Sequence, residues 1–135
     1  TIKIKDEYFV QEKNNIINTI TNICANLPCP LCSTHAMQIL KKYNFKNISK
    51  KDNLIKIIFI LHNEVNKNLK KTLFSYNKLI DSYNKYNFYD VLNEYNRVIN
   101  QSNYNERMML YSFHKKKFIL NFQSYFLKNI KYYNI

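Results

Sequence analysis

Apolar side chains recur every three or four residues along most of the chain, which is the pattern of helices buried on one face. The first stripe predicts a helix over about residues 8–26 that ends before Pro28. Its apolar members are Phe9, Ile16, Ile20, Ile23 and Leu27. Pro30 suits the first turn of a second helix, expected over about residues 29–43. Residues 44–51 are mostly polar and predict a loop.

Two further helices are expected before residue 86. The third has the clearest stripe, formed by Leu54, Ile57, Ile58, Leu61, Val65 and Leu69. The fourth is expected around Phe74, Leu79, Ile80 and Tyr83. Four such helices predict a small bundle. Residues 87–135 are expected to form a helical extension of unknown role. Its apolar positions are Val91, Leu92 and Tyr95, and then Ile119, Phe122, Phe126, Ile130 and Tyr133.

Composition supports an all-α fold, namely a four-helix bundle with a C-terminal helical extension. The chain has 135 residues, no glycine and two prolines. Sheets use glycine at bulges and tight hairpin turns, so its absence favours helices joined by polar loops. The length predicts one bundle domain over residues 1–86, followed by the extension over residues 87–135.

The formal net charge of +12 raises the question of an acidic partner. Lys, Asn, Ile and Tyr together make up about half of the residues, which is typical of AT-rich coding, so lysine is enriched everywhere. The only basic run is Lys115 to Lys117, and nucleic-acid binding is therefore not expected. No apolar stretch approaches the roughly 20 residues of a membrane span, so no membrane partner is expected either.

The segment from Cys29 to His35 carries the first candidate chemistry. Cys29 and Cys32 form a Cys-x-x-Cys pair at a predicted helix start, where the partial positive charge favours thiolate over thiol. One thiolate of such a pair can exchange with a disulfide while the other resolves the product. The same spacing also binds zinc, so the pair alone leaves both chemistries open. Cys24 is expected to be a buried, small apolar residue on the preceding helix.

A second group of polar side chains follows on the third predicted helix. His62, Asn63 and Asn66 would project on adjoining faces and offer an imidazole and two amides to a planar ligand. Lys70 and Lys71 follow one to two turns later, where they can neutralise phosphates.

Taken together, these two groups resemble the Erv/ALR family of FAD-dependent sulfhydryl oxidases. That family has a Cys-x-x-Cys pair, often with a nearby histidine, and about thirty residues later His-Asn-x-Val-Asn, then leucine, a basic residue and an aromatic. The matching residues here are Cys29, Cys32, His35, His62, Asn63, Val65, Asn66, Leu69, Lys71 and Phe74. The resemblance covers about residues 9–86 and is strongest to the short forms of large DNA viruses.

The resemblance implies a four-helix bundle that binds FAD, holds no metal and pairs as a homodimer. Cys32 would face the flavin, with a thiol pKa below the usual value of about 8.5, and Cys29 would exchange with substrate. The implied FAD contacts are His35, His62, Asn63, Val65, Asn66, Leu69, Lys70, Lys71, Phe74 and Tyr83. Electrons would pass from a dithiol protein through Cys29 and Cys32 to FAD and then to molecular oxygen. A viral origin implies the cytoplasm of an infected cell or the virion.

The sequence departs from the family pattern in its missing tryptophans and missing extra cysteines. The chain has no tryptophan, Ile57 stands where the family has one, and Tyr76 stands where a structural disulfide is expected. There is no second cysteine pair to act as a shuttle, so a separate thioredoxin-like protein would deliver the electrons.

Two alternatives remain open at the level of sequence. Cys29, Cys32, His35 and His62 have the ligand types of a structural zinc site. Zinc does not account for Asn63, Val65 and Asn66. The other alternative is a non-catalytic structural or virion protein that keeps the fold, which the missing tryptophans favour.

Overall fold

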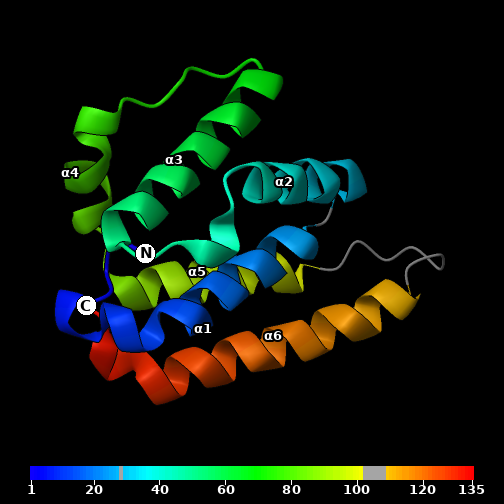
Figure 1. Ribbon diagram of the computed structural model, residues 1–135. Helices are drawn as coiled ribbons and strands as arrows, with labels where there is room; N and C mark the ends of the chain where they lie inside the picture. Colours follow the sequence, from blue (N-terminus) through cyan, green and yellow to red (C-terminus); the bar gives the residue numbers. More distant parts are fainter. Residues whose placement is uncertain (28, 102–108) are drawn as a thin grey trace. The chain divides into compact units, whose positions relative to one another are not determined.

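The computed structural model of the chain describes residues 1–27, 29–101 and 109–135 (Figure 1). All regular structure in these ranges is helical, which confirms the expected all-α class. The chain divides into two compact units, Thr1–Lys85 and Tyr86–Ile135. No helix within the described ranges is long and apolar enough to cross a membrane.

Helix α1 (Asp6–Ala25) confirms the first predicted helix. Asp6 and Glu7 lie in its first turn, where acidic side chains complement the positive end of the helix dipole. Its apolar face is buried at Phe9, Ile16, Ile17 and Cys24. Glu12 lies on the same face and is buried, and its carboxylate accepts hydrogen bonds from the amides of Gln11 and Asn15.

Helix α2 (Pro30–Lys42) begins with proline at its first position, as predicted. Asn44 follows its end in a left-handed conformation with φ 49°, which asparagine tolerates better than most residues. The next residues correct the sequence prediction of a polar loop. Phe45–Asn47 form the short 3₁₀ helix η1, in which Phe45 is only 2% exposed, and Ile48 is buried as well.

Helix α3 (Lys51–Asn68) confirms the third predicted helix and buries Leu54 and Ile55. It ends in a Schellman motif, in which the Lys71 N–H donates to the Asn66 carbonyl at 2.8 Å and the Lys70 N–H to the Lys67 carbonyl at 3.1 Å. Lys70 has φ 54° at the position that glycine normally takes, because this chain has no glycine.

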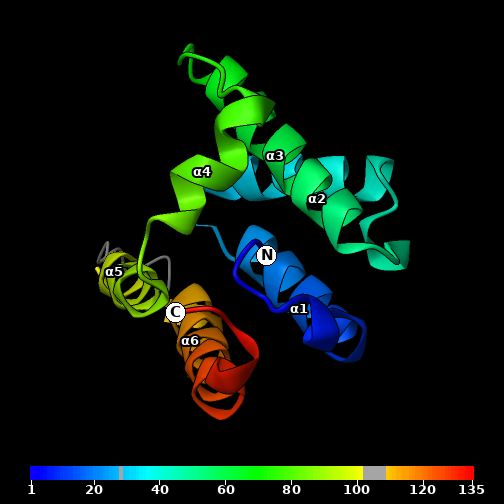
Figure 2. The ribbon, with the colours of Figure 1, turned by 90° about the vertical axis from the view of Figure 1, so that its left-hand side faces the viewer.

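Helix α2 contacts both α1 and α3 and lies between them (Figure 2). A salt bridge also joins the starts of α1 and α3, where Lys51 Nζ lies 2.6 Å from Asp6 Oδ1. The end of α2 connects to the start of α3 through η1, so the two helices run in opposite directions (Figure 1). This arrangement brings the start of α2 and the end of α3 to the same end of the unit.

The fourth predicted helix is shorter than expected. Helix η2 (Tyr76–Lys78) and helix α4 (Leu79–Asn84) include Leu79, Ile80 and Tyr83. Phe74, in contrast, lies in a non-helical segment over residues 71–75. The prediction was wrong for Phe74 because its backbone is bound by a side chain of α3 rather than by its own helix, as described below.

The second unit contains α5 (Phe88–Asn100), α6 (Met109–Asn129) and the 3₁₀ helix η4 (Ile130–Tyr132). Its core is aromatic. Phe88 stacks on Tyr133 with ring centroids 4.8 Å apart, and Phe122 packs edge-on against Phe126 at the same separation. Such ring pairs stabilise a small core beyond the apolar area that they bury.

Candidate functional site

The cysteine pair lies at the start of α2, where Cys29 is the N-cap and Cys32 stands in the first turn. Cys29 Sγ accepts a hydrogen bond from the backbone N–H of Cys32 at 3.2 Å. This bond satisfies one of the N–H groups that a helix leaves unpaired at its N-terminus. Both cysteines are exposed and neither is in a disulfide, so a partner thiol has direct access to them.

The geometry favours thiolate formation at Cys29 rather than at Cys32. Hydrogen bonds from the Cys32 thiol and from the Cys32 backbone N–H lower the pKa of Cys29. The same thiol–thiol hydrogen bond raises the pKa of Cys32, since Cys32 acts as the donor. In the flavin-free dithiol, Cys29 is therefore the cysteine with the lowered pKa, whereas the sequence prediction of a lowered pKa for Cys32 concerned Cys32 against bound flavin. The sequence placed both residues at the helix start, but only Cys29 occupies the capping position.

This difference predicts the order of alkylation in the reduced, flavin-free protein. Only the thiolate reacts with iodoacetamide, so Cys29 should react at a lower pH than Cys32. As pH rises, labelling of Cys29 should appear first and labelling of Cys32 should follow. Peptide mapping by mass spectrometry after limited labelling measures both sites. Earlier labelling of Cys32 would contradict the assignment.

A side-chain contact holds the end of α1 against the start of α2. Ser33 Oγ donates a hydrogen bond to the Cys24 carbonyl at 2.7 Å. Cys24 itself is 5% exposed, and burial raises the pKa of its thiol. The burial agrees with the sequence prediction for Cys24. The contact fixes both ends of the short connection that carries Cys29.

On α3, the amide of Asn63 binds the backbone of Phe74 from both sides. Asn63 Nδ2 donates to the Phe74 carbonyl at 2.9 Å, and the Phe74 N–H donates to Asn63 Oδ1 at 2.8 Å. Asn66 makes a longer contact nearby, from Nδ2 to the Thr72 carbonyl at 3.5 Å. These amides hold the segment over residues 72–74 along α3, where the sequence suggested that they bind a ligand directly.

The bound segment places three rings around one cavity. The Phe74 ring lies 6.4 Å from the His62 ring and 5.9 Å from the Tyr83 ring, measured between centroids. All three side chains line a cavity of about 240 Å³ whose other walls include Ile58 and Phe59. The structure thus brings together three of the residues that the sequence proposed, from three different elements.

Replacing Asn63 with alanine should therefore release the segment over residues 72–74. Two half-buried hydrogen bonds are lost, and we expect a cost of about 1–3 kcal/mol in the free energy of unfolding. Urea denaturation followed by circular dichroism measures this cost. Asn53→Ala, at an exposed position of the same helix, is the matched control and should change stability by about 0.5 kcal/mol or less. Equal stability of the two variants would contradict the role of Asn63.

A contact between α2 and α3 sets the distance between the cysteines and the ring-lined cavity. His35 Nδ1 lies 3.0 Å from Asn68 Nδ2, so these two residues are level. Cys32 precedes His35 by three residues on α2, and His62 precedes Asn68 by six residues on α3. Because α2 and α3 lead away from this contact in roughly opposite directions (Figure 1), Cys32 and His62 lie on opposite sides of it, about one turn and more than one and a half turns along their own helices.

That separation does not fit the zinc alternative. Zinc ligands lie within about 2.3 Å of the metal, so four ligand atoms must converge. Among the described residues, no three His, Cys, Asp or Glu side chains come together in a way that could hold a metal ion. The four proposed zinc ligands are thus not assembled at one point.

The remaining proposed residues surround the end of α3. Val65 is 37% exposed and Leu69 is 58% exposed, so both side chains are open to a ligand at the surface. Lys70 and Lys71 are exposed in the Schellman motif. The sequence analysis did not find Asn68 or Ser33, whose contacts position the site. Asparagine is so frequent in this chain that no sequence signal distinguished Asn68.

Comparison with known proteins agrees with this geometry. The sequence model of the Erv1 / Alr family matches residues 1–85. Two curated relatives are FAD-linked sulfhydryl oxidases of African swine fever virus, one from a Kenyan pig isolate and one from a Malawian tick isolate. Each is 33% identical over 73 residues, which cover 54% of this chain and 60% of the relative. No solved structure matches the chain.

Proposed function

The chain belongs to the Erv1 / Alr family, and from this premise we propose that it is an FAD-linked sulfhydryl oxidase that forms disulfides in partner proteins. One observation carries the proposal. The exposed pair Cys29 and Cys32 lies at the same end of the unit as the α3 terminus, and α3 also lines a ring-walled cavity. The curated relatives, matched over 73 residues, bear that activity in their names.

The residues of the cavity fit one ring system of FAD. A space of about 240 Å³ walled by His62, Phe74 and Tyr83 suits stacking on a flat heteroaromatic group. Lys70 and Lys71 offer positive charge for a diphosphate at the end of α3. When bound, FAD supplies a two-electron acceptor for the dithiol. The other residues that would line its path are His35, Asn63, Val65, Asn66 and Leu69.

The two cysteines would have different roles. A substrate thiolate attacks Sγ of Cys29 in the Cys29–Cys32 disulfide, forming a mixed disulfide and releasing Cys32 as a thiolate. The second substrate thiolate then attacks the substrate sulfur of that mixed disulfide and releases Cys29. The substrate leaves as a disulfide, and two electrons remain on Cys29 and Cys32. Cys32, as the cysteine proposed to face bound FAD, would deliver them to it, and molecular oxygen would be the final acceptor, leaving as hydrogen peroxide.

The wider assignments follow from the same premise. A dithiol protein, such as a thioredoxin-like shuttle, would be the electron donor, because the chain has no second cysteine pair. A homodimer would bury further apolar surface of a small bundle. The cytoplasm of an infected cell or the virion would be its location, as for a viral enzyme.

Light scattering at micromolar concentration tests the proposed homodimer. A monomer at that concentration would count against it.

The cofactor proposal predicts a yellow protein. Protein purified with excess FAD and then desalted should retain the visible absorption of flavin, because the rings of His62, Phe74 and Tyr83 hold it without a covalent bond. An absorption spectrum, with circular dichroism to show that the chain is folded, measures this directly. A folded and colourless protein would refute the proposal, and a folded, yellow protein that does not oxidise dithiols would support the non-catalytic alternative.

A further inference from the structure

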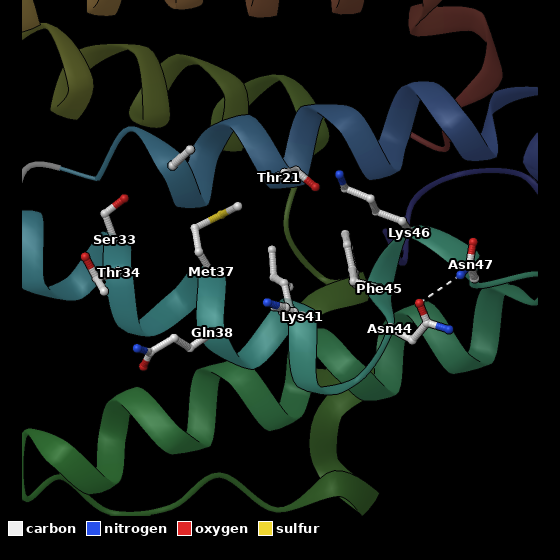
Figure 3. A pocket seen from close by; sticks show the side chains of 12 residues that line it. Thr21, Ser33, Thr34, Met37, Gln38, Lys41, Asn44, Phe45, Lys46 and Asn47 are labelled. Atoms are coloured by element: carbon white, nitrogen blue, oxygen red, sulfur yellow. Dashed lines mark hydrogen bonds between the residues drawn. The ribbon is translucent and has the colours of Figure 1, made fainter.

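A groove lies between α1, α2 and η1 and is lined by side chains from all three elements (Figure 3). Its volume is about 780 Å³. Ser33 and Thr34 line one end of the groove. They directly follow Cys32 near the start of α2. The cysteine pair is exposed at this end of the groove. A chain bound in the groove would therefore pass beside the reacting sulfur atoms.

The floor of the groove is apolar and its far end is basic. Met37, Leu40 and Phe45 line it, and the last two are buried. Lys41 and Lys46 line its far end, and Figure 3 shows their side chains on the two elements α2 and η1. No acidic residue lines the groove, and neither lysine is in a salt bridge within the part of the chain that the structure describes. The groove thus offers apolar contact together with two unneutralised positive charges.

The spacing along the groove sets a length for its occupant. Cys32 and Lys41 are nine residues apart on α2, which corresponds to about 13.5 Å at 1.5 Å per residue. An extended peptide covers that distance in about four residues at roughly 3.3 Å each. Cys29 Sγ lies 3.2 Å from the backbone nitrogen of Cys32, so an occupant whose cysteine bonds to Cys29 Sγ would reach Lys41 about four positions away.

We infer that this groove binds the substrate protein through an extended segment with apolar residues next to its reacting cysteine and an acidic residue about four positions away. The inference rests on the proposed oxidase function, because it names the class of dithiol that the cysteine pair accepts. Bond exchange follows the steps given above: the substrate sulfur bonds to Cys29 Sγ, the Cys29–Cys32 bond breaks, and FAD takes the two electrons. The groove positions the incoming thiolate and adds no chemical step of its own.

The test uses reduced Cys-x-x-Cys peptides with the full chain loaded with FAD. The two peptides of the first pair differ only in one residue, glutamate or lysine, placed four residues after the second cysteine. The two peptides of the second pair differ in the same way at the position four residues before the first cysteine. Oxidation is followed by mass spectrometry, and kcat/KM is compared within each pair. In one of the two pairs the glutamate peptide should be preferred by about three- to tenfold, as expected for two exposed charge pairs. The preference should shrink in high salt because screening weakens exposed charge pairs.

Reversing the charge of the groove lysines tests whether they cause the preference for the glutamate peptide. The double variant Lys41→Glu, Lys46→Glu should lose the preference for the glutamate peptide and favour the lysine peptide. Lys42→Glu is the matched control, because Lys42 lies in the same last turn of α2 but does not line the groove. This control should keep the original preference. A preference that survives in the double variant, or disappears in Lys42→Glu, would overturn the inference.

Dithiothreitol separates this inference from the proposed function. It is too small to span the groove, so its oxidation reports only on the cysteine pair and the flavin. If the loaded protein does not oxidise dithiothreitol, the proposed function fails. If dithiothreitol is oxidised but all peptides react at equal rates, the oxidase function stands and the groove proposal is overturned.

Discussion

Replacing Cys29 with serine is expected to reduce dithiol oxidation to the uncatalysed rate while leaving FAD bound. Cys29 is exposed and caps α2, so its sulfur is accessible for exchange. Serine can accept the same capping hydrogen bond, so the helix start should persist. Oxygen consumption with a reduced protein dithiol measures the activity, and flavin absorbance after desalting measures the binding. Undiminished oxidation by this variant would refute the role of Cys29.

The same variant should reveal Cys32 through an absorption band. Without Cys29 no active-site disulfide forms, and a Cys32 thiolate against the oxidised flavin should give a broad long-wavelength band. In the native dithiol, the hydrogen bond to Cys29 and the charge of Cys29 both raise the pKa of Cys32. A serine hydroxyl carries no charge and can donate to the Cys32 sulfur, so the Cys32 thiolate should form more readily in this variant than in the native dithiol. The band should be present above the pKa of Cys32 and fade as pH falls through it.

Cys32→Ser is the control for this spectrum and should show no band at any pH. The zinc alternative and a flavin-free fold predict no band in either variant. A band in Cys32→Ser instead of Cys29→Ser would mean that the two cysteines have exchanged roles. The spectrum therefore tests the assignment independently of turnover.

Truncating Phe45 to alanine is the second change with a large expected effect, here on stability. Phe45 is 2% exposed in η1, and it is among the three largest fully buried side chains of the described residues. Removing a buried phenyl ring costs its transfer free energy and leaves a cavity, together about 3–5 kcal/mol. That is a large part of the 5–15 kcal/mol that holds a typical domain folded. Denaturation monitored by circular dichroism measures the loss.

Tyr43→Ala is the matched control for Phe45→Ala. Tyr43 is an aromatic residue only two positions away, but it is 37% exposed and lies outside the core. Its removal should cost about 1 kcal/mol or less. A similar cost for both variants, or a cost below about 1 kcal/mol for Phe45→Ala, would show that η1 does not anchor the connection between α2 and α3.

The burial of Phe45 could not be predicted from the apolar pattern of the sequence. Helices α1 and α3 were predicted because an apolar stripe repeats over many residues, and each repeat adds to the signal. Phe45 and Ile48 are two apolar residues in a polar stretch, too few to define a period. Their burial depends on how α2 and α3 close around them, which is a tertiary property.

Phe74 was placed in a helix for a related reason. Its spacing from Leu79 and Tyr83 is compatible with one helix, but its backbone hydrogen bonds go to the Asn63 side chain, eleven residues earlier in the chain. The spacing of apolar residues contains no information about a hydrogen-bond partner that lies so far away in the chain. These hydrogen bonds give Asn63 a structural role that the sequence did not predict, because they position the Phe74 ring beside the cavity.

By itself, the sequence determined the helical class and the two long helices of the first unit, because these depend on local periodicity, and it led to the proposal that Cys29 and Cys32 are the reactive residues. Only the tertiary structure decided which cysteine has the lower pKa, since this depends on the single residue that caps α2. It also decided that His62, Phe74 and Tyr83 surround one cavity and that a basic groove begins beside the cysteines. Hydrogen bonds and cavities join residues that are distant in the chain, and their energies depend on position in space rather than on order in sequence.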